Sequence, residues 1–138
     1  MRHLHVATAI IRKDNIYYFQ LRNGNASIGA AGLIGSFGGK IEPGETAAQA
    51  VCREISEETS LSLSAERFKY LGNVDVVSDH NNETVSVKLE VFELDLGTET
   101  LEAKEGELVP FLVEELEKNV DQLTSGTRAC FKKFIQEK

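Results

Sequence analysis

Residues 39–61 read GKIEPGETAAQAVCREISEETSL, and this segment carries the clearest local signals in the chain. Thr46, followed three positions later by Gln49, forms the pattern of a capping box, which marks the first turn of a helix. Apolar residues then recur every four positions, as in a helix with one buried stripe, at Ala47, Val51 and Ile55. We therefore predict a helix that begins after Thr46 and ends near Thr59.

The segments before this helix predict a hairpin and a loop. Residues 3–12 and 16–22 are rich in β-branched and aromatic side chains, and the polar residues 13–15 between them favour a turn. Residues 23–39 contain many glycines, which favour a loop with tight turns.

The segments after the helix predict two strands and two further helices. Residues 67–77 and 83–96 alternate between apolar and polar side chains, and residues 79–82 between them favour a turn. Residues 113–119 and 127–136 favour helices. This order of elements predicts an α/β (α+β) fold in which a mixed β-sheet is sandwiched between helices.

Length and composition limit the class of protein. The 138 residues suit one compact domain, residues 1–138. A formal net charge of -7 disfavours a protein that binds a nucleic-acid polymer, because such surfaces are rich in Lys and Arg. The start of the chain lacks the long apolar segment of a signal peptide or membrane span. Cys52 and Cys130 form neither a disulfide framework nor a zinc pattern, so we expect free thiols and a cytoplasmic protein.

Three acidic residues of the predicted helix, Glu54, Glu57 and Glu58, fall at positions i, i+3 and i+4 and share one face, opposite the apolar stripe. Like charges at this spacing cost a helix roughly 0.2–0.5 kcal/mol per pair, which a solvated surface tolerates and a divalent cation offsets. Mg²⁺ takes oxygen ligands and commonly shares a few carboxylates with substrate phosphates. Taken alone, three such glutamates more often form a solvated acidic face than a metal site.

The spacing around these glutamates resembles the Nudix box, the signature of the Nudix hydrolase family. The box reads Gly, five residues, Glu, seven residues, then Arg-Glu-aliphatic-any-Glu-Glu-any-Gly-aliphatic. The matching positions are Gly39, Glu45, Arg53, Glu54, Ile55, Glu57, Glu58 and Leu61. Ser60 stands where the family has glycine. The resemblance implies the Nudix fold and an enzyme that hydrolyses phosphoanhydride bonds with Mg²⁺, or with Mn²⁺ as an alternative ion.

The resemblance also implies roles for the helix residues of the box. Glu54, Glu57 and Glu58 would bind the metal. Arg53 would lie beside them and orient a glutamate, with Glu57 as the expected partner.

The residues before the helix would shape the loop around the metal. The Gly38-Gly39 turn would bring a backbone carbonyl, expected to be that of Gly38, to the metal, because glycine allows the backbone to approach closely. Lys40 follows the glycine pair, as it often does in this family. Glu45 would support the start of the helix and the loop.

A second match lies downstream, in Lys104-Glu105-Gly106-Glu107. It resembles the segment that supplies a further carboxylate to the metal site of the antimutator 8-oxo-dGTP diphosphatase. This favours Glu105 for that role, with Glu107 as the alternative. A carboxylate that is not fully engaged with metal could accept the proton of the attacking water. Glu57 and Glu105 are both candidates for this general base, and the sequence does not choose between them.

The substrate class is inferred from signatures that the sequence lacks. The Walker pattern fails because Ile41, not Ser or Thr, follows the lysine, and the marks of the coenzyme A, NADH and ADP-ribose branches are not found. The chain then resembles the short nucleoside-triphosphate pyrophosphohydrolases, which release a nucleoside monophosphate and pyrophosphate. Residues 124–127 fall where the antimutator enzyme reads its purine with an asparagine, but they contain no amide.

Other readings of the same resemblance stay open. The substrate could be a dinucleoside polyphosphate, ADP-ribose or a nucleotide sugar, and the chain could be a nucleotide-binding regulator without turnover. Such regulators tend to lose carboxylates from the box, and this chain keeps all of them, which favours an enzyme. The implied partners are a small-molecule nucleotide and, since family members often form homodimers, a second copy of the chain.

Overall fold

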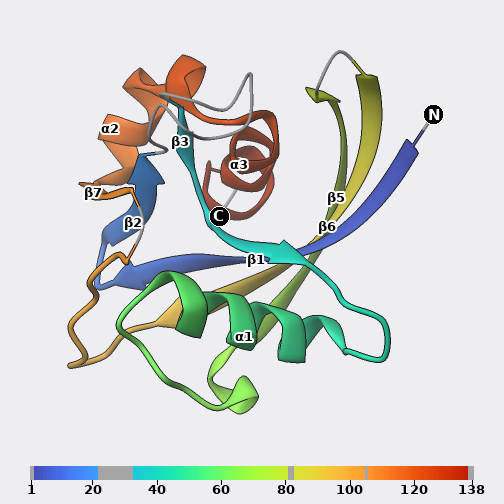
Figure 1. Ribbon diagram of the computed structural model, residues 1–138. Coiled ribbons are helices and arrows are strands. Elements are labelled where there is room, and N and C mark those ends of the chain that lie inside the picture. Colours follow the sequence, from blue (N-terminus) through green and yellow to red (C-terminus); the bar gives the residue numbers. More distant parts are fainter. Residues whose placement is uncertain (1, 22–32, 81–82, 105, 137–138) are drawn as a thin grey trace.

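The computed structural model describes residues 2–21, 33–80, 83–104 and 106–136, and Figure 1 shows how their elements are arranged. In chain order the elements are β1 (Arg2–Lys13), β2 (Ile16–Leu21), β3 (Ile34–Gly35), β4 (Phe37–Lys40), α1 (Ala47–Glu58), β5 (Lys69–His80), β6 (Glu83–Asp95), β7 (Glu107–Phe111), α2 (Val113–Lys118) and α3 (Ser125–Cys130). Two 3₁₀ turns (Ala65–Arg67 and Val120–Gln122) and a π-helical segment that continues α3 (Phe131–Gln136) are also present.

The sheet is built around β1. The described strands follow the order β3-β2-β1-β6-β5, with β4 paired to β1 and β7 paired to β2. β1 and β6 run parallel, and the other paired strands are antiparallel. The end of β1 turns back into β2 at Asp14, whose φ of 56° suits a tight hairpin turn. The middle of β1, residues 6–9, pairs with β4 and places Thr8 opposite Gly38.

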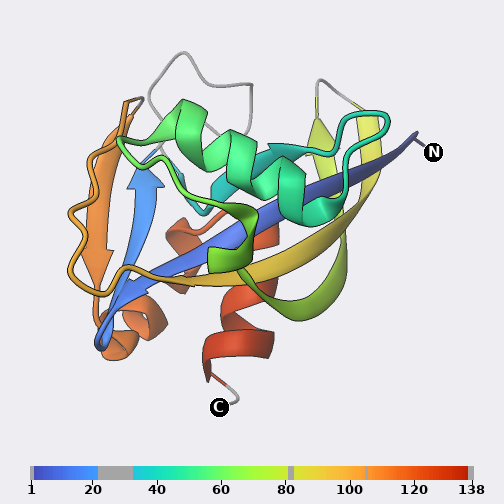
Figure 2. The ribbon, with the colours of Figure 1, turned by 90° about the horizontal axis from the view of Figure 1, so that it is seen from below.

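Each face of the sheet has its own hydrophobic core. Ala9 of β1 and Ile55 of α1 belong to one buried cluster. Ile10, the next residue of β1, belongs to a second cluster with Leu116 of α2 and Phe131, which directly follows α3. Figure 2 shows α1 and the C-terminal helices on opposite sides of the sheet. The predicted mixed sheet between helices is therefore confirmed.

The helix predicted within residues 39–61 is α1. The side chain of Thr46 accepts a hydrogen bond from the backbone N–H of Gln49, and the side chain of Gln49 accepts one from the backbone N–H of Thr46. Both halves of the capping box therefore form. Val51 and Ile55 are fully buried. The predicted helix and its capping box are confirmed, whereas Ala47, the first residue of the predicted stripe, is only partly buried.

The prediction of a loop over residues 23–39 is wrong for its second half. Ile34–Gly35 and Phe37–Gly39 belong to β3 and β4, which pair with β2 and β1. Pairing with strands distant in the sequence stabilises these short glycine-rich strands, and local propensity does not reveal such pairing. Residues 22–32 lie outside the described residues.

The hairpin, the strands β5 and β6 and the helix α2 are confirmed, whereas other boundaries differ from prediction. β5 continues to His80, into the predicted turn. α3 begins at Ser125, two residues early, because Thr124 caps it. The sequence did not predict β7, which contains Pro110 and pairs with the edge of β2.

Candidate active site

The three glutamates of α1 differ in how far they reach into solvent. The side chain of Glu57 is 58% exposed, whereas that of Glu54 is only 18% exposed. Glu58 turns toward β4, where its Oε1 accepts the N–H of Gly38 at 2.9 Å. Glu57 is therefore the outer member of the acidic ridge, and Glu58 is held against the strand.

The two glycines of β4 allow α1 to lie this close to the sheet. Gly38 has a φ of 153°, and a Cβ at this position would overlap the backbone of Ala7 and Thr8 on β1. A Cβ on Gly39 would instead overlap the carboxylate of Glu54. The first glycine thus brings β4 against β1, and the second leaves room for an acidic side chain.

Arg53 connects the helix to the turn that precedes it. Its Nε and Nη2 donate to the two carboxylate oxygens of Glu45, at 2.8 and 3.0 Å. Its Nη1 donates to Glu54 at 2.9 Å, and Nη2 also donates to the carbonyl of Lys40 at 3.1 Å. The contact with Glu57, the partner expected from the sequence, is longer at 3.4 Å. Arg53 is thus fixed mainly by Glu45 and, in turn, contacts Glu54.

The charges of this network shift the pKa values of its members. The hydrogen bonds from Arg53, followed by the backbone N–H of Glu42, lower the pKa of Glu45 to about 2. The same ion pair raises the pKa of Arg53. Burial raises the pKa of Glu54, although Arg53 opposes that shift. A charged Glu54 therefore carries a desolvation penalty that a bound cation would offset.

The end of α1 is tied to the segment that leads to residue 105. The helix ends without a left-handed residue, since Thr59 is extended and its hydroxyl donates to the carbonyl of Ile55. The N–H of Ser60 then bonds the carbonyl of Glu102, and the N–H of Lys104 bonds the carbonyl of Glu58. Ser60 in place of the family glycine is therefore accommodated by bonds to a neighbouring segment.

The downstream candidates are placed as follows. Glu105 lies outside the described residues, although its neighbour Lys104 is anchored at the end of α1. Glu107, the alternative, is an exposed residue at the start of β7, opposite Leu21 of β2.

A divalent cation fits the chemistry of these groups. Carboxylate and backbone oxygens are the ligands that Mg²⁺ prefers, and the missing side chain of Gly39 lets the Glu54 carboxylate lie directly against β4. Within the part of the chain that the structure describes, no three acidic, histidine or cysteine side chains are grouped closely enough to enclose an ion. If a cation binds here, the described groups, Glu54 and Glu58 against β4 with Glu57 beyond them, would supply only one side of its site.

A small pocket adjoins this site on the other face of the sheet. Its volume is about 100 Å³, and it shares Gly38 with the acidic site. It is lined by Val6, Thr8, Ser36, Gly38, Leu89, Thr124, Gly126 and Thr127. The segment 124–127, which the sequence placed at the base-reading position, is thus part of the lining. The hydroxyls of Thr8 and Ser36 were missed, because their neighbours come from distant parts of the chain.

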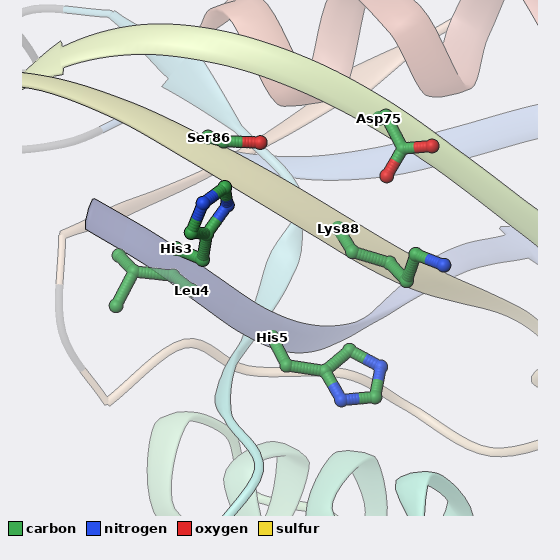
Figure 3. Close-up of a pocket in the computed structure, with 6 residues that line it drawn as sticks. All are labelled: His3, Leu4, His5, Asp75, Ser86 and Lys88. Atoms are coloured by element: carbon green, nitrogen blue, oxygen red, sulfur yellow. The ribbon is translucent and has the colours of Figure 1, made fainter. Parts of the chain in front are cut away.

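A second pocket, of about 270 Å³, lies at the first residues of β1 (Figure 3). It is lined by His3, Leu4, His5, Asp75, Ser86 and Lys88, from β1, β5 and β6. Figure 3 shows these side chains on three neighbouring strands, with His5 of β1 beside Lys88 of β6. The Nε2 of His5 contacts Glu90 at 2.6 Å. None of the glutamates of α1 lines this pocket, so it is separate from the acidic site.

Comparisons with known proteins agree with the family and the fold that the sequence predicted. The family model of the NUDIX domain matches residues 1–134, so the chain belongs to the Nudix family. We therefore assign it to the Nudix hydrolases, which are pyrophosphohydrolases, as the sequence predicted. A comparison with curated proteins gave no significant match. No helix among the described residues is long and apolar enough to cross a membrane.

Solved structures with the same fold cover almost the whole chain. A MutT NUDIX hydrolase from Burkholderia pseudomallei is 25% identical with a TM-score of 0.76, over 97% of this chain and 99% of that one. A MutT protein from Methanosarcina mazei Go1 is 24% identical with a TM-score of 0.75, over 99% and 95% of the two chains. The E. coli dihydroneopterin triphosphate pyrophosphohydrolase is 16% identical with a TM-score of 0.71, over 100% of both chains.

Proposed function

We propose that this chain hydrolyses a nucleoside triphosphate to a nucleoside monophosphate and pyrophosphate, with Mg²⁺ as the cofactor. The observation that carries the proposal is that the acidic site and the pocket of about 100 Å³ meet at Gly38. This residue binds Glu58 of the acidic site through its N–H and also lines the hydroxyl-rich pocket. A substrate whose nucleoside enters the pocket would direct its phosphates toward the glutamates.

Each residue of the site has a proposed role. Glu54, Glu57, Glu58 and the carbonyl of Gly38 would hold the cation, which when bound neutralises phosphate oxygens and acidifies a bound water. Glu105, for which only the neighbouring residues are described, would complete the ligand set.

The remaining roles concern protons and orientation. Glu57 is more exposed to solvent than Glu54, and its contact with Arg53 is the longer of the two, which supports it as the group that accepts the proton of the attacking water. Glu105 is the other candidate for this base. Arg53 would keep Glu54 in place, with Glu45 and the backbone of Lys40 holding the guanidinium.

A substrate panel tests the proposed reaction. Purified protein is incubated with Mg²⁺ and a set of nucleoside triphosphates, dinucleoside polyphosphates, ADP-ribose and nucleotide sugars. Phosphate that is released only when inorganic pyrophosphatase is added identifies pyrophosphate as the product. Products that release phosphate only with a phosphatase would instead indicate a dinucleoside polyphosphate, ADP-ribose or a nucleotide sugar. Absence of turnover on every compound would contradict the proposal and favour a regulator.

Variants of the ridge test the site itself. Glu57→Gln and Glu58→Gln should lower turnover by orders of magnitude while the protein stays folded, because each removes a charged oxygen ligand. Glu117→Gln, on the exposed side of α2, is the matched control and should keep wild-type turnover. Near-normal turnover in both Glu57→Gln and Glu58→Gln would contradict the proposed metal-dependent mechanism.

Further expectations about domain organisation, location and oligomeric state accompany the proposal. The chain would form one domain over residues 1–138, would act in the cytoplasm on small-molecule nucleotides rather than nucleic-acid polymers, and would need no membrane. A homodimer is tested by light scattering coupled to size exclusion.

A further inference from the structure

Thr8 is a buried polar residue of β1 whose hydroxyl is directed at the neighbouring strand. Its side chain is only 3% exposed, and it lies opposite Gly38 in the β1–β4 pairing. The hydroxyl donates to the carbonyl of Phe37 at 2.8 Å. Its oxygen also lies 2.7 Å from the Oγ of Ser36. Since Thr8 Oγ1 donates to the carbonyl, the hydroxyl of Ser36 is the donor in this second contact.

The carbonyl that Thr8 contacts belongs to the same peptide group as the N–H that holds Glu58. The Phe37–Gly38 peptide accepts a hydrogen bond from Thr8 at its oxygen and donates one to Glu58 Oε1, at 2.9 Å, from its nitrogen. A peptide that accepts at its oxygen is polarised, which strengthens donation from its N–H. Thr8 is therefore linked to Glu58 through one rigid, planar group.

The backbone around this peptide leaves it little freedom to move. A Cβ on Gly38 would overlap the carbonyl of Ala7 and the Cα of Thr8, so β1 and β4 are in contact at this residue. Rotation of the peptide would break either the bond from Thr8 or the bond to Glu58. The Thr8 hydroxyl thus helps to determine where the glutamate oxygen lies.

The hydrogen bonds continue from Thr8 to the start of α3. The N–H of Ser36 donates to Thr127 Oγ1 at 2.9 Å, and the hydroxyl of Thr124 donates to the same oxygen at 2.8 Å. These side chains line the pocket of about 100 Å³. A chain of hydrogen bonds therefore runs from the pocket wall to a glutamate of the acidic site.

We propose that Thr8 is a positioning residue, which fixes Glu58 for cation binding through the Phe37–Gly38 peptide. This inference rests on the proposed function, because it takes Glu58 to be a metal ligand. Thr8 acts through the peptide and does not itself contact the cation. Loss of its hydroxyl weakens cation binding even when no nucleotide is present.

The test measures binding of Mn²⁺ alone, with the free ion counted by electron paramagnetic resonance. Thr8→Val removes the hydroxyl and keeps the shape, and its Mn²⁺ dissociation constant should rise about tenfold, the lower end of the effect of losing an outer-shell partner of a metal ligand. Thr8→Ser restores a hydroxyl and should restore binding. Thr8→Ala replaces the valine variant if a thermal melt shows that valine is not tolerated.

Two further variants distinguish an effect that acts through the Phe37–Gly38 peptide from a general effect of altering the pocket. Ser36→Ala removes the bond that Ser36 donates to Thr8 but leaves the bond from Thr8 to Phe37, so Mn²⁺ binding should weaken less than in Thr8→Val. Glu58→Gln should weaken binding more than Thr8→Val does.

The outcomes distinguish this inference from the function on which it rests. Wild-type Mn²⁺ affinity in folded Thr8→Val and Thr8→Ala, together with a loss in Glu58→Gln, overturns the role of Thr8 and leaves the proposed function intact. Equal weakening in Ser36→Ala also overturns it, because the effect would then belong to the pocket. Wild-type affinity in Glu58→Gln overturns both.

Discussion

Gly39 of β4 and Glu54 of α1 are in such close contact that the glutamate carboxylate occupies the space where a side chain on residue 39 would begin. The contact joins the strand to the helix at the candidate metal site. Burial at this junction raises the pKa of Glu54, and Arg53 donates to it from the helix side. Glycine is thus needed at position 39 to leave room for the Glu54 carboxylate, and not because of the backbone conformation of residue 39.

This relationship predicts the effect of Gly39→Ala. The added methyl would displace only the end of a flexible side chain, so the free energy of unfolding should change little. The displaced Glu54 would no longer lie where the proposed function places the cation, and turnover should fall by about tenfold or more. Steady-state rates and thermal melts of the same preparation check both expectations.

Gly44→Ala is the matched control, with the opposite expected result. Gly44 has a φ of 83° and no atom within 4 Å of an added Cβ, so alanine would be strained but not crowded. Stability should fall by about 1 kcal/mol or slightly more, with unchanged turnover. Equal losses of turnover in the two alanine variants would show that Glu54 has no special role.

A second prediction concerns the two-pronged contact of Arg53. Lysine has one ammonium group and cannot bind both oxygens of Glu45 while also reaching Glu54. Arg53→Lys should therefore lower turnover by about 10- to 100-fold, as expected for loss of an outer-shell partner. The rate at saturating Mg²⁺ is the measurement.

Arg67→Lys provides the control for this substitution. Arg67 binds both carboxylate oxygens of Glu99, at 3.1 and 3.0 Å, in the same two-pronged manner but away from the acidic site. Its lysine variant should keep wild-type turnover. If both variants lost activity equally, the effect would reflect general destabilisation.

A third prediction follows from the low pKa of Glu45. Its folded-state pKa of about 2 lies below the value of about 4.3 for an unfolded glutamate. The ion pair with Arg53 therefore contributes fully above about pH 5, and its contribution is lost as the pH falls through 4 toward 2. The stability difference between wild type and Glu45→Gln should shrink between about pH 6 and pH 3. Urea unfolding at both pH values measures it, and a constant difference would contradict the ion pair.

A fourth prediction concerns the buried thiol of Cys130. Burial raises its pKa to about 12, and the residue is only 2% exposed. Because the thiolate is the reactive form, Cys130 should not react with a disulfide reagent near pH 8 until the protein unfolds. Peptide mapping after labelling distinguishes it from Cys52, which is less buried and contacts the carbonyl of Leu63. Rapid native labelling of Cys130 would contradict its placement in the core.

Much of α1 could be predicted because its determinants are close together in the chain. Thr46 and Gln49 lie within one helical turn, so their mutual capping depends only on helix geometry. The same geometry places Glu54, Glu57 and Glu58 on one ridge once the helix is recognised. Recognition of the family also followed from this one segment, and the match over residues 1–134 confirms it.

The sequence by itself determined the helix, its acidic ridge and the family, because these depend on spacing along a single element. Only the tertiary structure decided that Arg53 binds Glu45 and Glu54 more closely than Glu57, and that Gly38 holds Glu58. Those contacts require β4 to pair with β1 beside the helix. Such pairing joins residues that are far apart in the chain, and no local periodicity encodes which strands will meet.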